Sequence, residues 1–293
     1  MKTWSTPVRQ EKNAVIPCRV CGRSFFKPAF DCEGFGFTRC AECGLVQRNP
    51  QPLKEEIIAR YSSAFGEDYL SYELENETSF LRLQKLALKD AGFFKIDKAI
   101  FRAAGEGKPS ALDIGCATGA LPAFLRDRGW RVTGVEISPG AEYARNVRFL
   151  DVRSLPLEEN SFPDKSFDVV LASHLIEHLN DPYSFLTETY RILKDDGFAF
   201  ITTPNISGFQ ARIMGGKWRS AIFDHLYLFS VRTLSALLKK SCFKVEKIST
   251  WGGLASGLTL PWIKKTADLL AKRFAFGDVM IIRARKRTSA LLL

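Results

Sequence analysis

Between residues 110 and 204 the sequence alternates short apolar segments with amphipathic ones, and this alternation constrains the fold more than any other feature. The apolar runs fit strands, and the segments between them carry apolar residues at helical spacing. Such alternation is typical of βαβ units, in which helices cover both faces of a parallel sheet. The sequence therefore predicts an α/β fold. The expected strands are residues 110–114, 130–136, 167–172, 198–202, 243–249 and 279–284, and the expected helices are 119–128, 139–147, 182–193 and 230–240.

The 293 residues divide into three parts of different composition. Residues 1–52 are rich in Cys, Gly, Pro and Phe without a helical period, which predicts a small module of loops and hairpins. Residues 53–104 carry apolar side chains at helical spacing, so two or three helices are expected there. Residues 105–293 contain the strand–helix alternation and form the expected α/β domain.

Four of the seven cysteines form two CxxC pairs separated by 18 residues. This C-x2-C-x18-C-x2-C spacing is typical of a structural zinc site, in which four sulfurs hold one tetrahedral ion. A site closed by four cysteines has no open position, so its ion should stabilise a module too small to bury a core of its own. The alternatives are four unmetallated thiols or a redox-active pair. The expected zinc ligands are Cys18, Cys21, Cys40 and Cys43.

A glycine-rich turn, residues 115–119, lies directly between an expected strand and an expected helix. Such a turn lets backbone N–H groups approach a ligand, although alone it can equally be a tight connection. About 20 residues later the next strand ends in Glu136, from which a carboxylate reaches ribose hydroxyls in nucleotide-binding βαβ units. The two features together favour a nucleotide-containing ligand.

With these motifs, the chain resembles the class I S-adenosylmethionine-dependent methyltransferases. The resemblance rests on LDIGCATG (112–119), VTGVEIS (132–138), FLDVRSLP (149–156), the segment 166–205 and HLYLFS (225–230). It implies a Rossmann-like seven-stranded sheet with helices on both faces and an antiparallel last strand. Ala117 stands where the family's turn carries its middle glycine, and the turn lacks the glycine spacing of an NAD fingerprint.

The resemblance also implies which residues would bind S-adenosylmethionine. Asp113 would orient the turn, Glu136 would hold the ribose diol, and Ile137 would pack on the adenine. Asp151 would accept from the adenine amino group. The alternative for Glu136 and Asp151 is a solvated carboxylate. The full expected set is Asp113, Gly115, Cys116, Gly119, Glu136, Ile137, Asp151, Val152 and Ser173.

All three histidines are candidates for a general base, because imidazole titrates near neutral pH. His174 directly follows an expected strand, His178 follows closely, and His225 lies where related enzymes close over the substrate. Each can instead be a structural histidine bonded to backbone. His174-x-x-Glu177-His178 also resembles the E-x-x-E-H cluster of ubiquinone-pathway O-methyltransferases, which is associated with a divalent ion. Residues with this spacing can also simply pack.

The segment after the third expected strand, residues 173–176, lacks the N-P-P-Tyr-like motif of enzymes that methylate nucleobase amines or glutamine amides. This favours an oxygen or carbon acceptor on a small or carrier-bound molecule, such as a sugar or lipid-linked intermediate. The formal charge of +10 lies mainly in residues 1–60 and 244–293, so the nearly neutral centre disfavours a nucleic-acid substrate. An RNA methyltransferase with a zinc module and a non-catalytic scaffold protein remain the alternatives.

No apolar run approaches the roughly 20 residues needed to span a bilayer, and residues 1–15 lack the apolar block of a signal peptide. A cytoplasmic location is therefore expected. Residues 251–276 mix apolar and basic side chains and could be a substrate lid, a helix packed on the domain, or a helix in peripheral contact with an anionic membrane.

Overall fold

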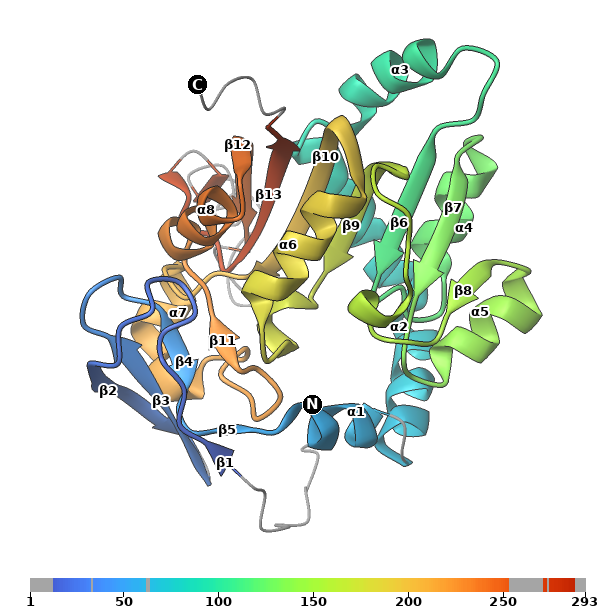
Figure 1. The fold of residues 1–293 in the computed structure, drawn as a ribbon. Coiled ribbons are helices and arrows are strands. Elements are labelled where there is room, and N and C mark those ends of the chain that lie inside the picture. The colour runs from blue at the N-terminus through green and yellow to red at the C-terminus, as the bar shows by residue number, and fades with distance from the viewer. Residues whose placement is uncertain (1–12, 33, 62–63, 253–270, 273, 288–293) are drawn as a thin grey trace, which may run out of the picture.

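A seven-stranded sheet forms the centre of the computed structural model, which describes residues 13–32, 34–61, 64–252, 271–272 and 274–287 (Figure 1). The strand order is β12-β13-β10-β9-β6-β7-β8. β13 pairs antiparallel with both β10 and β12, and the remaining pairs are parallel. The predicted Rossmann-like α/β sheet with an antiparallel last strand is confirmed. Its strands are β6 (Ser110–Ile114), β7 (Arg131–Val135), β8 (Asp151–Arg153), β9 (Phe167–Ser173), β10 (Leu193–Pro204), β12 (Phe243–Trp251) and β13 (Val279–Lys286).

Two strands differ from the sequence prediction. β8 was not predicted, because three residues are too few to show a strand period. β10 was expected from Phe198, but it begins at Leu193 and its register against β9 shifts between these two residues. Asp196, with φ 63°, lies within this irregularity, which interrupts the pairing without ending the strand.

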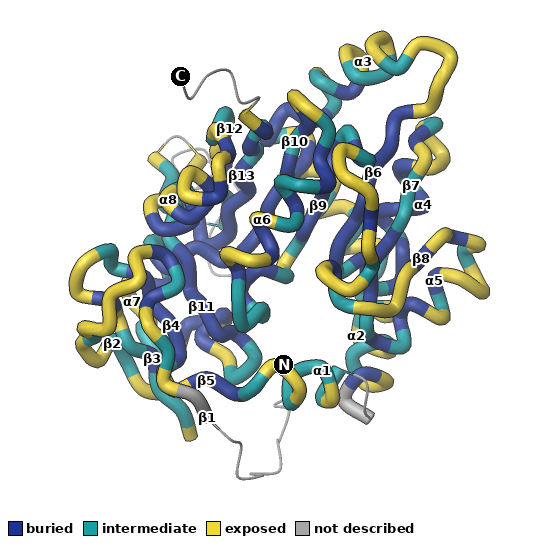
Figure 2. Tube along the Cα trace, viewed as in Figure 1, coloured by how far each residue is buried: buried dark blue, intermediate teal, exposed yellow. Residues whose placement is uncertain are grey.

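Alternate side chains of the strands belong to two separate apolar clusters that also contain helix residues. Figure 2 shows that the centre of the molecule is buried. α2, α3 and α4 pack on one face of the sheet, and α6 and α8 pack on the other. Asp181 caps α6 by accepting from two backbone N–H groups, and Ser230 caps α8 through a capping box. The helices are α1 (Lys54–Tyr61), α2 (Ala64–Asp90), α3 (Phe93–Ala104), α4 (Ala120–Asp127), α5 (Gly140–Arg148), α6 (Pro182–Ile192), α7 (Phe209–Met214) and α8 (Val231–Lys240).

Three short 3-10 turns complete the element order: η1 (Leu157–Glu159), η2 (Ile176–His178) and η3 (Gly215–Lys217). Among the described residues, no helix combines the length and the apolarity that crossing a bilayer requires.

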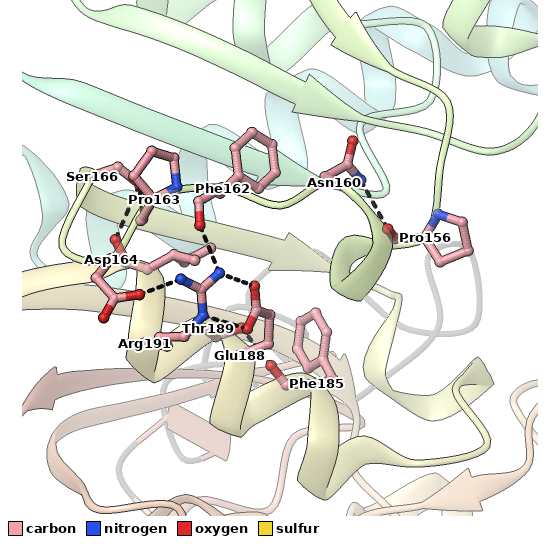
Figure 3. Close-up of polar contacts among 11 residues, drawn as sticks. Pro156, Asn160, Phe162, Pro163, Asp164, Ser166, Phe185, Glu188, Thr189 and Arg191 are labelled. Atoms are coloured by element: carbon pink, nitrogen blue, oxygen red, sulfur yellow. Dashed lines mark hydrogen bonds and ion pairs between the residues drawn. The ribbon is translucent and has the colours of Figure 1, made fainter.

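Arg191 fastens the loop before β9 to helix α6 (Figure 3). Its guanidinium pairs with Asp164 and with Glu188, and it donates to the carbonyl oxygen of Phe162 at 2.7 Å. The bonds to Asp164 and Phe162 therefore hold the loop before β9 against α6, which lies farther along the chain.

The cysteine-rich module shares a sheet and an apolar core with the rest of the chain. β1 (Asn13–Ala14) pairs with β5 (Gln51–Pro52), and a second sheet has the order β11-β4-β3-β2. Its strands are β2 (Phe26–Cys32), β3 (Phe35–Cys40), β4 (Val46–Arg48) and β11 (Tyr227–Leu228). β11 comes from the segment that links the large sheet to α8, so the module's sheet is completed by the α/β part. Both parts contribute to one apolar core that includes Phe37, Val46, Trp218 and Leu228.

Candidate active site

The glycine-rich turn lies at the carboxyl end of β6, where the sheet order changes direction. β6 pairs with β7 on one side and β9 on the other, and such switch points are where α/β sheets bind ligands. Gly115 and Gly119 have φ of 73° and 80°, and Ala117 has φ 47°. A Cβ on Gly119 would lie 2.6 Å from Leu150 Cδ1, so only glycine fits there. Ala117 takes a left-handed conformation although it replaces the glycine expected at this position.

Glu136 directly follows β7 and is 8% exposed. Its Oε2 accepts from the Ala117 N–H at 2.8 Å, and its Oε1 accepts from the Ser138 N–H at 2.8 Å. These two hydrogen bonds from N–H groups fix the orientation of the carboxylate. Each carboxylate oxygen can accept a further bond, so Glu136 has acceptor capacity left for a pair of hydroxyl groups.

Three other residues of the expected cofactor set are buried beneath this edge. Asp113 is 2% exposed, and burial together with the charge of Glu136 raises its pKa to about 8, so it is mainly protonated at neutral pH. Cys116 and Val152 pack together in an apolar cluster between α4 and α5. Their side chains therefore belong to the core, and only their backbone groups remain to face a ligand.

Asp151 lies apart from Glu136. It is the first residue of β8 and pairs in register with Thr133, three residues before Glu136. Its exposed carboxylate accepts from Thr133 Oγ1 at 3.1 Å. The structure therefore does not bring these two carboxylates together. Ile137, in contrast, is half-buried and immediately follows Glu136.

Helix α2 contributes a residue that sequence reasoning missed. Glu77 Oε1 accepts from Thr118 Oγ1 at 2.8 Å and pairs with Arg148, which donates through Nε to the Thr118 carbonyl oxygen at 2.8 Å. This Glu77–Thr118–Arg148 group, here called the turn clamp, ties α2 and α5 to the glycine-rich turn. Helical periodicity predicted the helix, but nothing in the local sequence indicates that Glu77 reaches a turn 41 residues away.

His174 follows Ser173, the last residue of β9, and its side chain is half exposed. Its φ is 53°, and its N–H donates to the Thr202 carbonyl oxygen at 2.9 Å, which extends the pairing of β9 with β10. A left-handed histidine at the carboxyl end of a central strand is the kind of strained position that is common at active sites. Its Nδ1 lies 3.3 Å from Glu177 Oε1.

Glu177 is fully buried, which its expected place in the H-x-x-E-H spacing with His174 and His178 did not indicate. Its Oε2 accepts from Thr203 Oγ1 at 2.9 Å. Burial alone would raise its pKa, but the adjacent rings of His174, His178 and His225 lower the pKa to about 2. The carboxylate is therefore ionised inside the protein, surrounded by all three histidines.

His178 and His225 lie beside Glu177 with their rings 4.7 Å apart. His178 Nδ1 lies 3.0 Å from the Asp224 carbonyl oxygen and 3.2 Å from the Tyr61 hydroxyl. His225 Nδ1 lies 2.7 Å from the Ser220 carbonyl oxygen. Burial first, and then the proximity of His178, lower the pKa of His225 to about 3, so this ring is neutral. A potential ligand atom of each of three residues lies within 4.8 Å of the other two: Glu177, His178 and His225. His174 is outside this group.

The four CxxC cysteines converge in the N-terminal module. Their sulfur atoms lie within 4.8 Å of one another, with Cys18 to Cys43 at 3.4 Å and Cys21 to Cys40 at 3.5 Å. Four sulfurs bonded to one zinc ion at about 2.3 Å are separated by about 3.8 Å, so this donor set fits the ion. Arg232 of α8 donates to the Cys43 carbonyl oxygen at 2.7 Å, which joins the cysteine cluster to the α/β part.

Most of the amphipathic segment 251–276 is outside the described residues, including 253–270 and 273. The lid, packed-helix and membrane interpretations of this segment therefore stay predictions.

Comparison with known proteins identifies a methyltransferase domain. Residues 85–248 match the family model for a methyltransferase domain. The chain is 29% identical over 164 residues to a ubiquinone biosynthesis O-methyltransferase of Nitrosomonas europaea, covering 54% of this chain and 64% of that protein. It is 29% identical over 149 residues to a demethylmenaquinone methyltransferase of Chlorobaculum tepidum, covering 48% and 57%. In both cases the match spans less than two thirds of the relative's length.

The fold is also shared with a solved structure, a SAM-dependent methyltransferase from Thermotoga maritima. The TM-score is 0.51 at 22% sequence identity, covering 74% of this chain and 97% of that one.

Proposed function

The chain belongs to the methyltransferase-domain family, and on that premise we propose that it transfers a methyl group from S-adenosylmethionine to an oxygen or carbon atom of a small or carrier-bound biosynthetic molecule. One observation supports this most strongly. The Glu136 carboxylate at the end of β7 is bonded to the glycine-rich turn at the switch point of the sheet. This arrangement provides a ribose-binding carboxylate next to a turn that a ligand can approach.

Different residues of the chain bind different parts of S-adenosylmethionine, the methyl donor. Glu136 accepts from the ribose hydroxyls, Ile137 packs on the adenine, and the backbone of Gly115 to Gly119 contacts the methionine part. Asp151 would reach the adenine only if its bond to Thr133 were exchanged. Bound S-adenosylmethionine supplies an activated methyl group on a sulfonium, so the protein must chiefly align the acceptor and remove a proton where the acceptor carries one.

His174 is the residue we assign to proton removal. It is the most exposed of the three histidines and lies at the carboxyl end of β9, next to the turn strand β6. Its Nδ1 faces the buried Glu177 carboxylate, which would hold that nitrogen protonated and leave Nε2 as the basic atom. Thr203 fixes the other oxygen of Glu177, so the orientation of this pair is set from β10. His225 is buried and His178 is half-buried, and a ring nitrogen of each lies within hydrogen-bond distance of a backbone carbonyl oxygen, which makes them poorer candidates for the base.

The names of the curated relatives, which concern quinone biosynthesis, support a small-molecule acceptor. A sugar or lipid-linked intermediate falls within the same class. We further propose that Cys18, Cys21, Cys40 and Cys43 hold a structural zinc ion, which would stabilise the module that packs on β11 and α8.

The direct test uses S-adenosylmethionine with a labelled methyl group, incubated with pools of sugars, nucleotide sugars, quinone precursors and acyl-carrier conjugates. The proposal expects S-adenosylhomocysteine to form with at least one pool, and expects the Glu136→Gln variant to lose this turnover. Binding of S-adenosylhomocysteine without turnover in any pool would favour the scaffold alternative, and enrichment of label in RNA would favour the RNA alternative.

A further inference from the structure

Glu177, His178 and His225 form a second cluster of metal-ligating groups, separate from the cysteines. Glu177 and His178 belong to η2, whereas His225 belongs to the segment just before β11. Glu177 is 0% exposed and His225 is 7% exposed. One ligand atom of each of the three lies within 4.8 Å of the other two. We call these residues the carboxylate–histidine group.

The hydrogen bonds of the two rings leave one nitrogen of each free to ligate. A backbone carbonyl oxygen can only accept a hydrogen bond, so Nδ1 of His178 donates to Asp224 and Nδ1 of His225 donates to Ser220. Each Nε2 then carries the lone pair. An imidazole that donates through one nitrogen to a carbonyl and presents the other to the ion is the usual arrangement at metal sites.

The carboxylate of Glu177 also has lone pairs available for a further ligand. Its Oε2 accepts from Thr203 Oγ1, and each of its two oxygens keeps acceptor capacity for a further ligand. His174 Nδ1 approaches Oε1 to 3.3 Å. A carboxyl group removed from water is costly unless donors or a cation compensate it. A buried carboxyl group that meets two imidazoles, with one ligand atom of each within 4.8 Å of the others, therefore points to a cation.

We propose that Glu177, His178 and His225 bind one divalent transition-metal ion through a carboxylate oxygen and two Nε2 atoms. Two imidazoles and one carboxylate suit ions such as Zn²⁺, Co²⁺ and Mn²⁺ better than Ca²⁺ or Mg²⁺, which prefer all-oxygen sets. Three protein ligands leave at least one coordination position for water or an acceptor oxygen. Binding of the ion does not depend on methyl transfer; only a role toward the acceptor rests on the proposed function.

This ligand set differs from the one that the local H-x-x-E-H spacing suggests. The spacing groups His174 with Glu177 and His178, but in the structure His174 is at the surface and His225, 47 residues after His178, takes its place. The two sets make opposite predictions for variants at positions 174 and 225.

The test uses the full chain with its cysteine site already filled with zinc, titrated with Co²⁺. We expect one further equivalent to bind, with visible absorption but without the thiolate-to-cobalt charge-transfer absorption that cysteine ligation would produce. Glu177→Gln and His225→Gln should each weaken this binding at least about tenfold. The matched control, His174→Gln, should leave it unchanged.

Each variant is also titrated with S-adenosylhomocysteine, and a retained affinity shows that the domain is folded. Absence of a further Co²⁺ equivalent in the wild type would overturn the site. So would unchanged Co²⁺ affinity in both Glu177→Gln and His225→Gln, or loss of Co²⁺ binding in His174→Gln alone. Because these readouts need no acceptor, their failure is distinct from failure of the proposed methyl transfer.

Discussion

The backbone N–H of Ala117 donates to Oε2 of Glu136 at 2.8 Å, so the glycine-rich turn and the carboxylate that follows β7 form one unit. Neither half of this unit is specific alone. A turn of this kind occurs wherever a strand meets a helix closely, and a carboxylate at a strand end is often only solvated. Their direct bond orients the carboxylate toward the edge where ligands of α/β sheets bind.

The turn clamp should contribute to donor binding from outside this unit. Glu77→Gln removes the charge that pairs with Arg148 and weakens the bond from Thr118, so the turn loses its tie to α2. We expect S-adenosylhomocysteine to bind about three- to tenfold more weakly, measured by calorimetry, because one charge-assisted hydrogen bond contributes about 1.5–3 kcal/mol before solvent screening. Glu75→Gln, an exposed change on the same helix, is the control and should have no effect.

Replacing His174 should affect catalysis without affecting donor binding. A general base contributes about 10²- to 10⁴-fold to rate, so His174→Gln should slow turnover by at least about 100-fold on an acceptor that must lose a proton. Calorimetry should show an unchanged affinity for S-adenosylhomocysteine, since His174 is on the acceptor side. An undiminished turnover number in this variant would remove His174 from the mechanism.

The cysteine cluster should hold zinc in the purified chain. We expect one tightly bound equivalent by elemental analysis, lost in Cys40→Ser together with a lower melting temperature, because folding of the module and ion binding are coupled. Cys242→Ser, which changes an exposed thiol, should keep the full zinc content. Less than about half an equivalent in the wild type, with four reactive thiols, would argue against the zinc site.

Asp168 should make the stability of the sheet depend on pH. Partial burial raises the pKa of this carboxyl, but bonds from Lys194 and from the N–H and hydroxyl of Ser110 outweigh it and lower the pKa below 3.8. A depressed pKa in the folded state stabilises the protein above the unfolded-state pKa, and this contribution is lost as the pH falls through the folded-state value.

Asp168→Asn should therefore reduce the free energy of unfolding by about 1–2 kcal/mol at pH 7, as followed by urea denaturation. The difference from the wild type should shrink below pH 3.8, the ordinary pKa of the group, as the native carboxyl becomes protonated. Asp127→Asn, which changes a surface carboxylate paired with Arg126, should alter stability little at either pH. A deficit of equal size at pH 7 and in acid would show that Asp168 acts by packing rather than by charge.

Local sequence patterns predicted the large sheet and most of its helices, because strand alternation, helix caps and the glycine-rich turn depend only on residues close together in the sequence. Asp181 and Ser230, for example, each directly precede the helix that they cap. The sequence did not predict that β11 would complete the sheet of the cysteine module, since Leu228 and Val46 come together only when both parts fold. Glu77 was missed for the same reason. Glu177 was grouped with His174 and His178, but its local sequence does not indicate that His225 lies beside it in the fold.

Calorimetric titration of S-adenosylhomocysteine into the wild type and into Glu136→Gln is the most direct test of the central claim. The account predicts a single site per chain in the wild type. It predicts at least about tenfold weaker binding in Glu136→Gln, since a neutral amide cannot accept both ribose hydroxyls as the carboxylate does. Glu142→Gln, an exposed change on α5, should bind as the wild type does. No binding by the wild type, or equal affinity in wild type and Glu136→Gln, would contradict the assignment of this edge as the donor site.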